Sequence, residues 1–151
     1  MFTGWVFPRT DLHVSVAGVE IKPVLALGSW AAFAGNDSDA MVMGDLVLLE
    51  NELTSVMKKL RAAGFDITAV HNHVLNEAPH VIYMHYMGYG KAVELAKSLH
   101  SALAESKKPP PGTRVATWYA KKLGIPVAMV NKVSRSYKPP PNDERVVHYM
   151  F

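Results

Sequence analysis

The period of hydrophobic and polar positions changes several times along the chain, and each change predicts a new element. Between residues 12 and 49, short apolar runs alternate with turn residues, as in HVSVAGVEI, ALGSWAAFAG and the loop GNDSD. The next run, AMVMGDLVLLE, is strongly apolar apart from Asp45. Runs of this kind, bounded by Gly, Asn and Asp, are typical of β-strands. This part of the sequence therefore predicts several strands joined by turns.

Residues 51–64 show a helical period instead. Apolar side chains recur at i, i+3, i+4 and i+7 and form one stripe of an amphipathic helix, at Leu53, Val56, Met57 and Leu60. Gly64 stands where a glycine after the last turn would end this helix. FDITAVHNHV and VIYMHYM then predict two strands, with NEAPH as a short turn between them. A second helix is predicted over KAVELAKSLHSALAES, residues 91–106.

This order of elements predicts an α+β fold with a β-α-β-β-α core. Such a chain forms a mostly antiparallel sheet with the two amphipathic helices packed on one face. The composition changes at Lys107, where KKPPPGT cannot continue a helix and is typical of a stiff linker. We therefore predict a single α+β domain over residues 1–106, followed by a proline-rich linker and C-terminal extension over residues 107–151.

Composition and charge narrow the function classes. The chain has no cysteine, which excludes disulfides, thiolate metal sites and cysteine nucleophiles. The formal net charge is +3, but the basic residues form no stripe interleaved with aromatics, which argues against a nucleic-acid partner. The start of the chain has no basic segment followed by a sustained apolar run, and no apolar run approaches the roughly 20 residues of a membrane span. We expect a cytoplasmic protein without a membrane partner.

Histidines gather in the segment HNHVLNEAPHVIYMH, residues 71–85, which holds four of the seven in the chain. On one strand, His71 and His73 should point to the same face with their Cα atoms about 6.5–7 Å apart. The following turn should bring His85 opposite them, with Glu77 at the mouth of the site. Three imidazoles and a carboxylate suit a divalent metal ion, with zinc as first choice and manganese, iron, copper or nickel as alternatives. The competing interpretation is that these histidines are hydrogen-bonded residues of a half-buried strand.

Three side chains are candidates for a catalytic role. Glu77 would be either the fourth metal ligand or the general base. Asp45 interrupts an apolar strand, so it would either orient a ligand imidazole or serve as a structural hydrogen-bonding residue. Tyr83 shares the face of His85 and would either donate a proton or pack in the core.

The same motifs resemble those of the LppY/LpqO-type bacterial proteins, a conserved family without an assigned function. The resemblance covers about residues 6–105 and rests on GDLVL, a helix, and then HNHxxxExPxxxxMHxxGxG. It implies that His71, His73, Glu77 and His85 belong to the family's pattern. Members often carry two copies of this unit, whereas this chain has one, so we expect a homodimer in place of the tandem pair.

These observations predict a metal-dependent hydrolase that uses metal-activated water on a small ester or lactone. The chain has neither a cysteine nor a GxSxG motif, so water is the natural nucleophile. Two alternatives stay open. One is a cupin-like metal-dependent oxygenase, and the other is a metal-binding module without enzymatic activity.

Overall fold

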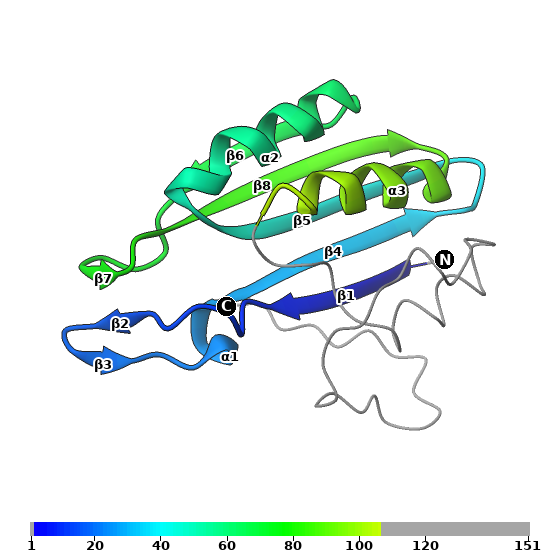
Figure 1. Ribbon diagram of the computed structural model, residues 1–151. Helices are drawn as coiled ribbons and strands as arrows, with labels where there is room; N and C mark the ends of the chain where they lie inside the picture. The colour runs from blue at the N-terminus through cyan, green and yellow to red at the C-terminus, as the bar shows by residue number, and fades with distance from the viewer. Residues whose placement is uncertain (1, 107–151) are drawn as a thin grey trace.

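The computed structural model describes residues 2–106, and the predicted linker and extension over residues 107–151 lie outside them. Its main feature is a five-stranded antiparallel sheet (Figure 1). The strands, in their order across the sheet, are β1 (Phe2–Pro8), β4 (Gly28–Gly35), β5 (Ala40–Leu49), β8 (Val81–Gly90) and β6 (Asp66–His71). The long strands β5 and β8 are neighbours and pair along their whole length.

Two helices cover one face of this sheet, α2 (Glu50–Ala62) and α3 (Ala92–Leu103), and Figure 1 shows them on the same side. A single helical turn, α1 (Pro23–Ala26), leads into β4. A small second sheet has the order β3 (Val19–Glu20), β2 (Ser15–Val16), β7 (Glu77–Ala78). The predicted α+β fold is therefore confirmed. None of the helices within residues 2–106 is long and apolar enough to cross a membrane.

The main hydrophobic core lies between the five-stranded sheet and the two helices. Alternate residues of β5 and β8 point into it, together with the apolar stripes of both helices, and its members include Val42, Leu46, Leu48, Val56, Leu60, Met84, Tyr86, Leu95 and Leu99. The opposite side of the same strands is here called the open face. One end of the open face is covered by α1 and the small sheet, through a second cluster of Val14, Leu27, Val47, Val81 and Tyr83.

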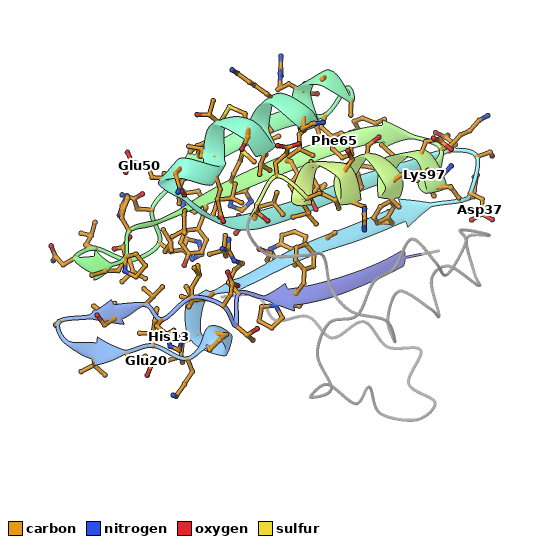
Figure 2. The ribbon with its side chains drawn as sticks, viewed as in Figure 1. His13, Glu20, Asp37, Glu50, Phe65 and Lys97 are labelled. Carbon is orange, nitrogen blue, oxygen red and sulfur yellow. The ribbon has the colours of Figure 1, made fainter. Side chains whose placement is uncertain are left out.

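The end of α2 follows the pattern that the sequence indicates. Gly64 has a φ of +85°, which a glycine adopts without strain, and its amide donates to the carbonyl of Arg61. The amide of Phe65 donates to the carbonyl of Leu60 at 3.0 Å. Phe65 is buried beneath the helix end (Figure 2). The turn therefore both ends the helix and anchors the start of β6.

Gly44 on β5 leaves the space that the buried ring of Tyr86 occupies in the core. Gly44 pairs with Tyr86 on β8, and a Cβ at this glycine would collide with the Tyr86 ring and with the carbonyl of Trp30. The Tyr86 ring therefore lies across the bare backbone of Gly44, and its hydroxyl donates to the Trp30 carbonyl at 3.2 Å. A larger residue would displace this buried tyrosine.

The structure also differs from the sequence-based elements. Strand β1 was not predicted, because FTGWVFP has neither clear alternation nor a turn signal before it. Strand β6 ends at His71 instead of continuing to Val74, and the residues after it form a bend. The predicted turn over residues 76–80 contains β7, which pairs with β2.

A buried ion pair ties the N-terminal part of the chain to α2. The guanidinium of Arg9 lies 2.8 Å from a carboxylate oxygen of Glu52, and both side chains are less than 5% exposed. Arg9 also donates to the carbonyl of Val47 at 2.8 Å and contacts Asp11. Glu52 in turn accepts the amide of Leu49 at the start of α2. One arginine thus connects β1, β5 and α2.

We expect Glu52→Ala to lower the free energy of unfolding by about 3 kcal/mol, because it leaves the buried Arg9 charge without its buried carboxylate partner. Urea unfolding followed by circular dichroism measures this change. The control is Glu94→Ala, which removes an exposed pair with Lys97 and should cost less than about 1 kcal/mol. Equal losses in both variants would contradict the structural role of the buried pair.

Candidate functional site

The pairing of β5 with β8 and of β8 with β6 brings the predicted site residues together on the open face. Asp45 is the direct register partner of His85, and His71 is the direct partner of Tyr83. Because side chains alternate along a strand, Asp45, Tyr83, His85 and His71 all point to the same side of the sheet. Residues that are far apart in the sequence therefore form one cluster.

The rings of this cluster are in contact. The Nε2 atoms of His71 and His85 lie 2.8 Å apart, and the two rings stack with their centroids 4.9 Å apart. At this distance one ring nitrogen donates a hydrogen bond to the other. The ring centroid of His73 lies 4.9 Å from that of His71, and the His73 ring stacks on the ring of Tyr83 with their centroids 4.0 Å apart. The three predicted histidines therefore do converge.

His73 reaches the cluster by a different route from the one predicted. It was expected to share a strand with His71, but β6 ends at His71 and His73 lies in the following bend. Its ring returns toward the open face by packing against Tyr83. Partial desolvation lowers the pKa of His73 below its ordinary value, although the charge of Asp45 acts in the opposite direction. His73 is thus favoured in the neutral form that a metal ligand requires.

Asp45 is the buried carboxylate of the site. Its side chain is 6% exposed, and its Oδ2 lies 3.9 Å from Nε2 of His85. Its Oδ1 is buried without any hydrogen-bond partner. Burial raises the pKa of Asp45 above its ordinary value, whereas His85, His73 and His71 act to lower it. A buried carboxylate oxygen without a partner is costly unless a proton or a cation satisfies it.

Tyr83 supports the histidines with its ring. Its hydroxyl donates to the carbonyl of Ala26 at 2.7 Å, which ties β8 to α1. Burial and the charges of Asp45 and Glu77 raise the pKa of Tyr83 to about 12. The hydroxyl therefore keeps its proton at neutral pH and already has an acceptor. The ring of Tyr83 contacts His71 and His73, and a role of its hydroxyl as proton donor stays a prediction.

Glu77 is held by a partner outside the cluster. Its side chain is 1% exposed, and its Oε1 lies 2.8 Å from Nδ1 of His80 and 3.4 Å from the amide of Val81. These contacts fasten β7 to the start of β8. His80 thus satisfies the carboxylate that the sequence placed at the mouth of the metal site. Asp45 is the carboxylate that lies next to the histidines.

The donors are of the kinds that bind a divalent ion, but their present spacing does not hold one. No group of three or more His, Asp or Glu side chains within residues 2–106 is already spaced for a metal ion. Two nitrogens on one tetrahedral zinc ion lie about 3.4 Å apart, so the rings of His71 and His85 would separate by about 0.6 Å to admit one. Asp45 supplies the argument for an ion, because its unpartnered Oδ1 lies in the same cluster as these imidazoles.

Comparison with known proteins assigns the chain to a family. The family model described as Domain of Unknown Function (DUF1259) matches residues 2–105. No curated protein and no solved structure matches the chain. The matched range contains every residue of the cluster. The description of the family carries no link to LppY/LpqO-type proteins, so that resemblance stays a prediction.

The raised pKa of Asp45 predicts a pH-dependent stability. A carboxyl group with a raised folded-state pKa stabilises the fold below its unfolded value of 3.8, and this contribution is lost as the pH rises through the folded-state pKa. In protein treated with chelator, Asp45→Asn should therefore gain stability relative to wild type between about pH 4 and about pH 8. Urea unfolding at several pH values measures the difference.

The exposed Asp39 supplies the matched control, since Asp39→Asn removes one carboxylate without changing a buried group. Its stability difference from wild type should stay nearly constant over the same pH range. If Asp45→Asn instead became progressively less stable than wild type toward higher pH, contacts within the metal-free fold would already stabilise the ionised carboxylate.

Proposed function

Because the chain belongs to this family of unknown function, we propose its function from the side chains of the site: a metal-dependent hydrolase that acts on a small ester or lactone. His71, His73 and His85 would hold a divalent ion, with zinc as first choice, and Asp45 would lie beside it. The observation that carries the proposal is the buried, unpartnered Oδ1 of Asp45 in a cluster of three imidazoles. In such surroundings a cation satisfies both the carboxylate and the ring nitrogens.

The accessibility of the cluster supports a catalytic site more than a closed structural one. The side chain of His85 is 37% exposed, His73 is exposed and His71 is half-buried, so water and a small substrate can reach the ring nitrogens. Structural metal sites are usually closed by four protein ligands, whereas catalytic sites keep an open position. Among the histidines and the carboxylate of the cluster, Asp45 is the group that is shielded from solvent.

The chemistry that a bound divalent ion supplies is polarisation of a substrate carbonyl and a lowered pKa of water. The chain's own residues would divide the remaining work. Asp45 would accept a proton at Oδ1, because its raised pKa makes the carboxylate a stronger base than an exposed aspartate. Tyr83 would hold the ring of His73 by stacking. Glu77, to which the sequence also assigned the role of base, would instead stabilise the β7–β8 connection through His80.

The two alternatives differ from the hydrolase in measurable ways. A cupin-like oxygenase would require a redox-active iron, copper or manganese in the same ligands. A metal-binding module without activity would unfold on removal of its ion, as structural metal sites do. The homodimer and the small-molecule substrate likewise stay predictions.

Metal content tests the site. We expect wild-type protein to hold about one zinc ion per chain by plasma mass spectrometry, and His71→Ala and His85→Ala to lose most of it, since each removes an imidazole nitrogen that would bind the ion. The matched control is His13→Ala. His13 is an exposed histidine beside the small sheet, paired with Glu20 at 3.1 Å (Figure 2), and its removal should leave the metal content unchanged.

Three outcomes of this experiment have different meanings. Iron, copper or manganese in place of zinc, lost in the same variants, would move the proposal to the oxygenase. Zinc that is retained in both His71→Ala and His85→Ala would place the ion elsewhere in the chain. Protein that neither carries nor regains a divalent ion would overturn the metal site.

Activity measurements distinguish the proposed roles of Asp45 and Glu77. With the zinc-loaded protein and a panel of small esters and lactones, Asp45→Asn should lower kcat by about 100-fold or more, the usual effect of removing a general base. Glu77→Gln should keep kcat within a few-fold of wild type and lower the melting temperature, because it weakens the buried contact with His80. The reverse pattern would restore Glu77 as the base.

A further inference from the structure

Three methionines lie on the open face, next to the histidine cluster but separate from it. Met43 on β5 is the direct register partner of Met87 on β8, and Met41 is the partner of Tyr89. Met41 and Met43 are two residues apart, as are Met87 and Tyr89, so all four side chains point to the same side of the sheet. This side is opposite the core that α2 and α3 cover.

These side chains are accessible in the described part of the chain. Met43 is 40% exposed and Tyr89 is 65% exposed, whereas Met41 and Met87 are half-buried. The two other methionines of residues 2–106 are placed differently. Met84 is fully buried in the main core, and Met57 packs against that core from α2. The methionines of the open face are therefore not required to fill the core.

The geometry allows three thioethers to meet. Cβ atoms of directly opposite residues in an antiparallel pair are about 4.5–5.5 Å apart, and those of diagonal neighbours less than about 8 Å. A methionine sulfur lies two bonds beyond Cβ on a flexible chain. The Sδ atom of Met87 accepts a hydrogen bond from the Tyr89 hydroxyl at 3.5 Å, and Tyr89 is the direct register partner of Met41.

We infer that Met41, Met43 and Met87 form a thioether site for a soft monovalent cation of the Cu(I) type. Thioether sulfur is a soft, uncharged ligand that selects such ions over zinc or magnesium. The chain has no cysteine, so methionine is its only source of sulfur ligands. A second metal site would thus lie on the same two strands as the histidine cluster. Met43 lies two residues before Asp45 on β5, and Met87 lies two residues after His85 on β8.

The inference does not depend on the hydrolase. The proposed hydrolase site uses imidazole nitrogens and a carboxylate, which suit a divalent ion, whereas the methionine site offers sulfur alone. The two sites should therefore be separable by substitution. Loss of zinc in His85→Ala with retained binding of a soft cation would support both assignments at once.

The test is a titration of the full-length protein with Cu(I) under anaerobic conditions, in competition with a colorimetric Cu(I) chelator. We expect about one Cu(I) per chain with wild type, and a loss of at least 10-fold in affinity in the triple variant Met41→Leu, Met43→Leu and Met87→Leu. Leucine keeps the size and apolar character of methionine, so the fold should survive. The matched control, Met57→Leu, should bind Cu(I) like wild type.

A second measurement identifies the atoms. With methyl-13C-labelled methionine, the redox-inert ion Ag(I) should shift the three methyl resonances that disappear in the triple variant, and should leave those of Met57 and Met84 in place. Equal Cu(I) affinity in wild type and the triple variant would overturn the inference, and would assign any bound copper to the histidines or to another part of the chain. So would Ag(I) shifts that spare all three of these resonances.

Discussion

The pairing of β5 with β8 is the constraint on which the rest of the structure depends. Ten residues of each strand pair without a shift, from Ala40 opposite Gly90 to Leu49 opposite Val81. Because side chains alternate, a slip of one residue would move every core side chain to the open face and every open-face side chain into the core. Gly44 and Tyr86 help to fix this register, since the tyrosine ring fits only over a residue without a Cβ.

The same register places the apolar core residues on one face of the sheet and the candidate site residues on the other. The face toward α2 and α3 carries Leu46, Met84 and their neighbours and supplies most of the hydrophobic stabilisation. The open face carries groups that do not favour folding by themselves, above all the buried carboxylate of Asp45. Local features that oppose stability are often found at functional sites. The strong pairing and core of the first face allow the second face to hold such a group.

The sequence was sufficient for the elements whose periodicity is strong. The stripe of α2, the stop at Gly64 and the paired strands around residues 66–90 follow from spacing and turn residues alone. Strand β1 and the short strand β7 could not be found in this way, because their pairing partners, and not their own patterns, make them strands. Short elements of this kind are decided by tertiary contacts.

The candidate site was only partly predictable for the same reason. The sequence indicates two consecutive strands joined by a short turn, one with His71 and one with His85. The contact between these two histidines could therefore be predicted. Which carboxylate would join them depends on tertiary structure, because Glu77 is closer in sequence but is held by His80, whereas Asp45 comes from another strand. The available signal was the position of Asp45, a single charge in an apolar strand. Because side chains alternate along a strand, the position of Asp45 next to a core residue assigns it to the open face once the pairing is known.

We propose that the β5–β8 register brings Asp45 and the three histidines around one divalent ion. The decisive measurement is a crystal structure of the zinc-loaded protein, with anomalous scattering measured at the zinc absorption edge. We expect one anomalous peak between Nε2 of His71 and Nε2 of His85, within bonding or hydrogen-bonding reach of the Asp45 carboxylate. A peak elsewhere in the molecule, or zinc-soaked crystals without a peak at this cluster, would contradict it.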